Sequence, residues 1–240
     1  MNIIIFATYF NQKVRSFLLI LLGVLLSTTT LSAQIYELGI FAGGSNAVGD
    51  VGKEDYIAPN SLAIGGVFRY NRSPRHSWRL SVLTSNLKID DTQSATSRKE
   101  RGYVLENAVT EFTAALEFNF FDFNLHSLDT KITPYVFTGL SYFRYESKYF
   151  KDAKEQLDKK NGSFAIPMVV GVKAKLNRSF VLGVEVGARY TFVDDLDGSN
   201  PKSGEYQQYK FGNLSSKDWY VFTGITLTYM FGEQPCYCSF

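Results

Sequence analysis

The stretch FTAALEFNF at residues 112–120 decides the fold of this chain. Phe112, Leu116 and Phe120 fall on one parity of the stretch, and Thr113 and Glu117 fall on the other. Successive side chains of a β-strand point to opposite faces, so alternation this regular predicts a strand between an apolar and a polar environment.

Seven further stretches show strand-like patterns. They lie near residues 35–43, 62–70, from 78 onward, 133–145, 168–175, 180–190 and 219–231. The connections between the stretches alternate in length, with long polar loops at 44–60, 90–107, 146–162 and 193–218 and short turns near 71–77, 122–131 and 176–179. This rhythm predicts antiparallel hairpins with turns at one end and loops at the other. The stretch at 133–145 is aromatic on both parities, so the alternation does not show which parity faces inward.

The charged side chains predict which face of these strands points outward. In five of the stretches, those starting at 62, 78, 112, 168 and 180, every charge lies on the less apolar parity. A soluble barrel would turn the apolar parity inward, whereas a membrane barrel turns it toward lipid. Strands of about 9 to 13 residues suit a tilted membrane crossing. The sequence therefore predicts an all-β protein, an eight-stranded antiparallel transmembrane β-barrel with a lumen filled by side chains.

The N-terminus has the three parts of a secretory signal. Lys13 and Arg15 are followed by an apolar run at 17–26 and by small polar residues up to Ala33. The apolar run is shorter than the roughly 20 residues of a membrane-spanning helix. We expect cleavage after Ala33, which divides the chain into a signal peptide (1–33), a barrel in the outer membrane (34–232) and a periplasmic tail (233–240).

The charge balance gives no support for a nucleic-acid partner. The chain has 240 residues and a formal net charge of +2. Removal of Lys13 and Arg15 with the signal leaves 23 basic and 23 acidic residues. A nucleic-acid-binding domain is typically strongly basic.

Eight charged residues are predicted to line the lumen. They are Glu37, Arg69, Arg79, Glu117, Lys173, Lys175, Glu185 and Arg189. Two interpretations compete, an anion pathway and a packed network of ion pairs that fills the barrel. Because eight strands enclose a space only wide enough for side chains, we expect the filled lumen.

The sequence gives little support for an enzyme. The two histidines, His76 and His126, both fall in predicted turns, and no Gly-x-Ser-x-Gly nucleophile motif is present. The run DDLDGSN at 194–200 has the composition of a calcium loop but not the EF-hand spacing, and the same residue types dominate ordinary turns. We therefore expect no catalytic residue, no cofactor, no metal and no small-molecule substrate.

The two cysteines stand at the end of the chain. Cys236 and Cys238 are separated by one residue in the predicted periplasmic tail. Three interpretations stay open: a strained bond with each other, a disulfide with a partner protein, or no role.

Several runs together resemble one known family. They are Gly-Gly-Ser-Asn at 43–46 with Gly-Asp-Val-Gly at 49–52, NRSPRHSWR at 71–79, FNFFDF at 118–123, TPYVFTGL at 133–140, GARYTF at 187–192, DGSNP at 197–201 and PCYC at 235–238. In combination they are similar to PorG-like proteins of the type IX secretion system, over essentially the whole mature chain.

The resemblance implies a non-enzymatic component of that secretion system, in which the barrel holds the periplasmic PorK and PorN ring to the outer membrane. The exposed periplasmic segments would be 73–76, 124–129 and the tail. The candidate partner interface is then Ser73, Arg75, His76, Cys236 and Cys238. The alternative is an adhesion or envelope-integrity barrel that acts through its extracellular loops.

Overall fold

Eight strands form a closed antiparallel barrel. The computed structural model describes residues 36–94, 96–125, 127, 129–213 and 216–232, so the predicted signal peptide, Cys236, Cys238 and the tail lie outside the described residues. The strands are β1 (Tyr36–Val48), β2 (Ser61–Asn71), β3 (His76–Asp90), β4 (Val104–Asn119), β5 (Ile132–Lys151), β6 (Lys154–Lys175), β7 (Phe180–Thr191) and β8 (Trp219–Phe231). Each strand pairs with its sequence neighbour, and β1 pairs with β8. The predicted fold class is confirmed.

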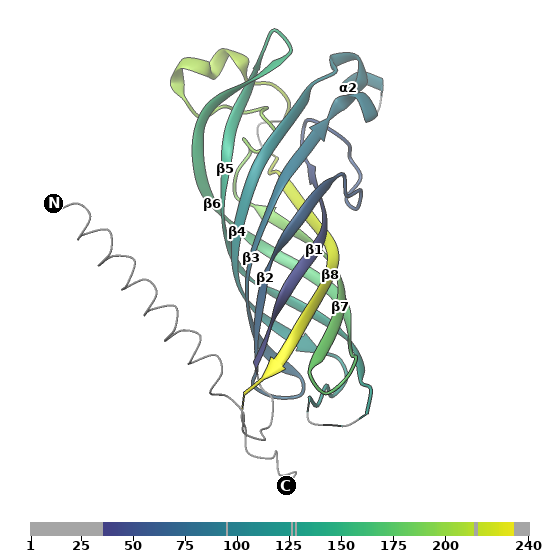
Figure 1. Ribbon diagram of the computed structural model, residues 1–240. Helices are drawn as coiled ribbons and strands as arrows, with labels where there is room; N and C mark the ends of the chain where they lie inside the picture. The colour runs from purple at the N-terminus through teal and green to yellow at the C-terminus, as the bar shows by residue number, and fades with distance from the viewer. Residues whose placement is uncertain (1–35, 95, 126, 128, 214–215, 233–240) are drawn as a thin grey trace, which may run out of the picture. The chain divides into compact units, whose positions relative to one another are not determined.

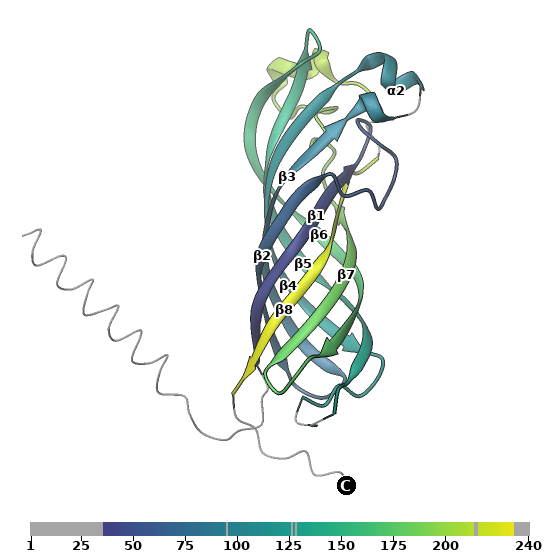
Figure 2. The same ribbon diagram turned by 45° about the vertical axis from the view of Figure 1, so that its right-hand side comes forward.

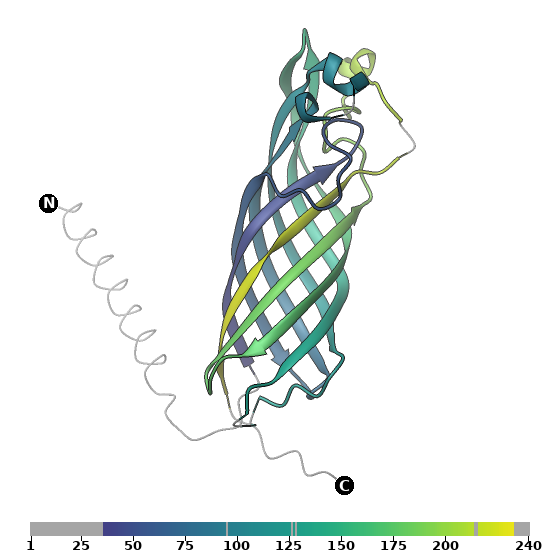
Figure 3. The same ribbon diagram turned by 90° about the vertical axis from the view of Figure 1, so that its right-hand side faces the viewer.

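The barrel closes through a long, regular pairing. The β1–β8 register runs from Tyr36 opposite Phe231 to Val48 opposite Trp219 without interruption. Figure 1 and Figure 3 show the strands tilted strongly against the long direction of the barrel, as closure of an eight-stranded sheet requires. Between β1 and β8, Gly39 and Gly43 permit close contact, because a Cβ on either residue would meet the β8 backbone within 2.2 Å.

The connections distinguish the two ends of the barrel. We call the end with residues 72–75, 120–131 and 176–179 the turn end, and the end with residues 49–60, 91–103, 152–153 and 192–218 the loop end. The loop end carries the 3₁₀ helices η1 (Asp91–Gln93) and η2 (Gly204–Tyr209) and the short helix α2 (Thr96–Arg101). Among the described residues, no helix has the length and hydropathy to cross a membrane.

The predicted loop at 146–162 is wrong. β5 and β6 continue through it as a hairpin whose turn is only Asp152 and Ala153, both with positive φ (53° and 61°). Two positive φ values match the right-handed twist of the strands, as in a tight hairpin turn. Figures 1 and 2 show this hairpin rising past the other strands at the loop end. The loop predicted at 90–107 is also shorter than expected, because β3 ends at Asp90 and β4 begins at Val104.

Side chains alternate between the lumen and the outside along each strand. In β4 outward-facing and buried residues alternate without exception, from exposed Val104 to buried Asn119. The outward parity is apolar, with Leu140 52% exposed and Val170 54% exposed. The open question about β5 is settled, because Tyr135 and Phe143 are buried in the lumen and Leu140 and Tyr142 face outward.

Candidate functional site

The exterior of the barrel is bordered by aromatic side chains at both ends. At the turn end Tyr36 contacts Tyr70 and Phe231, with ring centroids 5.4 Å and 5.7 Å apart. At the loop end Tyr190 packs against Trp219, with centroids 5.0 Å apart. Other members of the two borders are Phe180 and Tyr229 at the turn end, and Tyr142, Phe164 and Phe192 at the loop end. An apolar band between two aromatic girdles is the surface that a barrel presents to a bilayer.

All eight predicted lumen charges are buried inside the barrel. Each is at most 4% exposed. Seven of them form ion pairs in two networks. Lys175 belongs to neither network.

Glu117 is the centre of the larger network. Its carboxylate lies 3.0 Å from Arg69 Nε, 3.5 Å from Arg79 and 2.5 Å from Lys173 Nζ. Arg69 also reaches Glu37 at 3.0 Å. Three cations are thus shared among three acids, the third being the carboxylate described next. Buried charges persist when they are paired in this way.

Glu185 completes this network through a bidentate contact. Arg79 donates two hydrogen bonds to its carboxylate, at 2.8 Å and 2.7 Å. The Tyr135 hydroxyl donates a third at 2.5 Å. The Arg79 guanidinium also lies 4.1 Å from the ring centroid of Phe137, a cation–π contact that covers its face. Planar pairing of this kind fixes both side chains in one geometry.

The second network lies nearer the loop end and contains Glu111, which is not among the eight predicted lumen charges. Arg189 contacts Glu111 at 3.3 Å, and the Tyr220 hydroxyl donates to the same carboxylate at 2.5 Å. Glu111 is fully buried. It shares the inward parity of Thr113 and Glu117, so extending the β4 alternation by one step identifies it.

Lys175 holds the connection at 120–131 instead of pairing with an acid. Its ammonium donates to the carbonyls of Leu125 and Ser127. Leu125 is 5% exposed and packs with Phe123, Val181 and Met230. The turn therefore folds into the mouth of the barrel. The prediction that 124–129 is an exposed segment is wrong for Leu125, because its apolar side chain is inserted in the barrel.

The predicted partner residues of the first turn lie on the surface of the turn end. Arg75 and His76 are exposed, and Ser73 is half-buried. Arg75 contacts Asp122 at 2.5 Å, although both side chains are more than half exposed. The Ser73 hydroxyl accepts from the His76 backbone N–H at 3.0 Å, which closes the turn. The structure brings these three together, while Cys236 and Cys238 lie outside the described residues.

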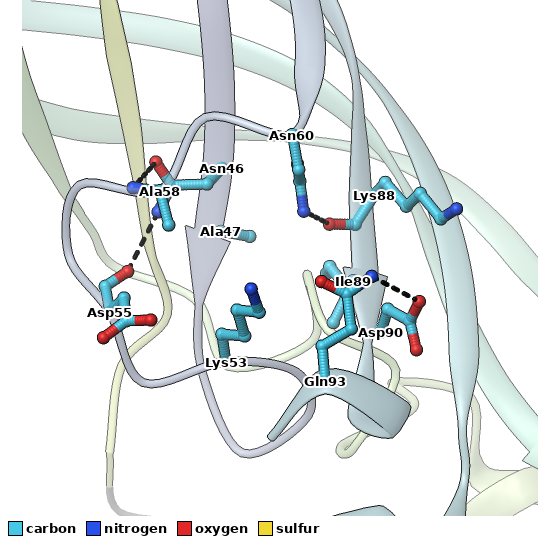
Figure 4. A pocket seen from close by; sticks show the side chains of 10 residues that line it. All are labelled: Asn46, Ala47, Lys53, Asp55, Ala58, Asn60, Lys88, Ile89, Asp90 and Gln93. Carbon is cyan, nitrogen blue, oxygen red and sulfur yellow. Dashed lines mark hydrogen bonds between the residues drawn. The ribbon is translucent and has the colours of Figure 1, made fainter.

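At the loop end the first loop folds back against β1 and β3. Figure 4 shows Asn46 bridging to Asp55 and Ala58, and Asn60 donating to the Lys88 carbonyl at 2.8 Å. The cavity between these side chains is about 10 Å³. Such a space holds at most one water, so it is no ligand site.

The acidic run at 194–200 is tied into the loop end by hydrogen bonds. Among the described ranges of the chain, no group of three or more His, Cys, Asp or Glu side chains is arranged to hold a metal ion. Asp194 bonds Asn200 at 2.9 Å, and Asp195 accepts from the Tyr145 hydroxyl at 2.7 Å. The carboxylates of this run therefore organise the loop.

One family profile matches nearly the entire chain. The profile described as Domain of unknown function (DUF6089) covers residues 15–240. The chain belongs to this family. No curated protein matches the sequence significantly.

Several solved barrels are similar to this DUF6089 chain. The N-terminal β-barrel domain of Pseudomonas aeruginosa OprF has 12% identity and a TM-score of 0.43, over 82% of this chain and 99% of that one. Yersinia pestis Ail, solved with the heparin analogue sucrose octasulfate, has 12% identity and a TM-score of 0.47, over 83% and 99%. Neisserial surface protein A has 12% identity and a TM-score of 0.46, over 82% and 97%. These likenesses are too distant to transfer a function.

Proposed function

We propose that this protein is a non-enzymatic outer-membrane barrel of the type IX secretion system that anchors the periplasmic PorK and PorN ring. The outer-membrane part of this proposal is supported by the apolar exterior between two aromatic girdles. An exposed apolar surface of this extent would aggregate in water. A secretory signal at 1–33 is the expected route to that membrane.

The anchoring role is supported by the family resemblance and by the form of the turn end. Short turns of outer-membrane barrels face the periplasm, so Ser73, Arg75 and His76 would face the ring. Arg75 and His76 are exposed there without filling the lumen. A filled lumen also favours anchoring over transport, because the ion pairs of Glu117 and Glu185 occupy the cross-section.

Site-specific cross-linking tests the anchoring role. We expect photo-cross-linkers at positions 75 and 76 to capture PorK or PorN in intact cells. As a matched control, cross-linkers at Lys99 and Lys154, both exposed at the loop end, should capture neither protein. Capture of the ring from the loop end alone would refute the proposed orientation and interface.

A second candidate function is adhesion through the loop end. It is favoured by the β5–β6 hairpin, which carries exposed charged side chains beyond the aromatic border at Tyr142 and Phe164. A deletion strain separates the two functions. Loss of protein secretion supports anchoring, whereas intact secretion with altered surface binding supports adhesion.

A further inference from the structure

Asp197 joins two loops that are far apart in the sequence. Its Oδ2 accepts hydrogen bonds from the backbone N–H groups of Asp50 at 2.6 Å and Val51 at 3.1 Å. Its Oδ1 accepts from the N–H of Ser199 at 2.9 Å. One buried carboxyl group of the fourth loop (192–218) therefore holds the start of the first loop (49–60).

Asp218 places a second carboxyl group at the same junction. Its Oδ2 accepts from the Leu196 N–H at 2.9 Å. A Cβ built on Gly49 would lie 2.5 Å from Asp218 Oδ1 and 2.6 Å from Asp197 Oδ2. The two oxygens are therefore at most about 5 Å apart. Asp197 is 1% exposed and Asp218 is 2% exposed.

No counter-ion contacts this pair among the residues that the structure describes. The cations nearby are engaged elsewhere: Lys202 contacts Asp195 at 3.6 Å, and Arg101 contacts Asp91 at 2.7 Å. Arg98 donates to the carbonyls of Gly49 and Gly52, at 2.9 Å each, and contacts Glu54 at 3.2 Å. The other charged or titratable groups that face the junction are the acids Asp50, Asp194 and Asp195, the phenol of Tyr145, and Lys217 on the side of Asp194. The charges of Asp194, Asp195 and Asp197 all disfavour ionisation of the Asp218 carboxyl group.

Burial and repulsion act in the same direction on the pair. Burial raises the pKa of the Asp218 carboxyl well above its usual range, and the charge of Asp197 raises it further. Burial also raises the pKa of Asp197, although its backbone hydrogen bonds oppose that shift. Asp197 accepts three backbone N–H groups and Asp218 accepts one, so Asp218 is the better place for a proton.

We propose that Asp197 and Asp218 share one proton, and that this proton holds the first and fourth loops together at the loop end of the barrel. The O–H of Asp218 would donate to the carboxylate of Asp197. Gly49 makes room for this contact, since any side chain there would separate the two oxygens. The inference rests on the burial and closeness of the two carboxyl groups and is independent of the secretion role.

The sign of the pH dependence follows from the raised pKa. When the loops separate, the pKa of each carboxyl group returns to the ordinary Asp value of 3.8. The closed form therefore binds more protons than the open form. The loop contact is then strongest below pH 3.8 and weakens as the pH rises through the raised pKa of the pair. For one proton, the closing equilibrium changes by up to about tenfold per pH unit.

Hydrogen–deuterium exchange of the folded, full-length mature protein in detergent tests this inference. We compare peptides covering 49–60 and 192–218 at pH 5 and pH 8.5, after correction for the intrinsic exchange rate. In the wild type we expect at least a tenfold loss of protection at pH 8.5. In Asp218→Asn the amide accepts from Leu196 and donates to Asp197 permanently, so we expect protection at pH 8.5 to stay within about threefold of the pH 5 value.

Two further variants keep the test decisive. Asp152→Asn removes an exposed acid at the β5–β6 turn, where Asn tolerates the positive φ, and should respond to pH as the wild type does. Gly49→Ala should lose protection at both pH values, because its methyl group displaces the carboxyl groups. The exchange of Gly49→Ala can be measured even if Asp218→Asn does not fold.

Three results would overturn the shared proton. The first is wild-type protection that does not change with pH. The second is a full pH response in Asp218→Asn. The third is protection at pH 8.5 that 1 mM CaCl₂ restores in the wild type but not in Asp218→Asn, because a cation would then bridge the carboxylates.

Discussion

Replacement of Glu117 by Gln should strongly destabilise the barrel. The carboxylate is fully buried and lies within 3.5 Å of three cations, Arg69, Arg79 and Lys173. Arg69 keeps Glu37 as a partner at 3.0 Å, and Arg79 keeps Glu185 at 2.7 Å. Lys173 has no other acid within 4.0 Å among the described residues. The cost of the substitution is therefore mainly that of an unpaired buried ammonium.

The expected magnitude follows from that unpaired charge. Removing one partner of a buried pair costs about 3–5 kcal/mol, far more than the net contribution of an intact pair. The Phe123 ring, 4.9 Å from Lys173 Nζ, offsets part of this through a cation–π contact of about 1–2 kcal/mol. We expect Glu117→Gln to lower the free energy of unfolding by about 1–4 kcal/mol.

A double variant isolates the cause. In Glu117→Gln with Lys173→Met, the unpaired charge is gone and the chain length of the side chain is kept, so at least half of the lost stability should return. Stability is measured by urea titration in detergent, followed by the fluorescence of Trp78 and Trp219. As a surface control, Glu106→Gln at an exposed position should change stability by less than about 0.5 kcal/mol. If Glu117→Gln loses less than about 1 kcal/mol, or the double variant is less stable than the single one, the reasoning is wrong.

Three further expectations follow from the same geometry. The purified protein should give no stable conductance in planar bilayers, because side chains fill the lumen; reproducible single-channel steps would contradict this. Leu140→Arg on the outward face should cost about 2–4 kcal/mol in lipid vesicles, and Ala108→Arg near the loop end about 0–1, so equal costs would argue against a membrane position. Lys175→Met should weaken the docking of residues 120–131 by about 1–3 kcal/mol, seen as faster chymotrypsin cleavage near Phe123, and an unchanged rate would show that Lys175 does not hold the turn.

The barrel itself is predictable from the sequence because its strands see two different environments. β7 and β8 begin at Phe180 and Trp219, as the alternation predicts, and β8 ends at Phe231. The tight turn at 176–179 makes the β6–β7 hairpin recognisable in the sequence as well. Period two is strong here because a lipid-facing residue and a lumen-facing residue have opposite preferences.

The upper part of the β5–β6 hairpin is not predicted, because it lacks these two opposite environments. Residues 146–162 extend past the aromatic border, so neither of their faces meets lipid and both carry charged side chains. Without an apolar face there is no alternation to read. The turn also lacks the Asn-Gly or Asp-Gly signal, since Asp152 is followed by Ala153.

The lumen residues could be predicted individually, but most of their partners could not. Glu37 and Arg69 lie opposite each other in the β1–β2 hairpin, so hairpin register suffices to pair them. Arg79 and Glu185 are 106 residues apart and meet across the lumen. That contact depends on the tilt and stagger of all eight strands, which alternation within one strand does not specify. The insertion of Leu125 was missed because a short turn of mixed polarity carries no periodic signal.

The charged lumen also explains how one register is selected over its neighbours. A slip of one residue between two strands moves every side chain to the other face. For β2 such a slip would place Arg69 in lipid, and for β4 it would place Glu111 and Glu117 there. Each exposed charge near the bilayer centre would cost several kcal/mol, whereas an apolar lumen would penalise the same slip only through packing. Buried ion pairs contribute little net stability compared with apolar side chains of equal volume. Their value in this barrel is therefore greatest as a penalty on slips of one residue between its strands.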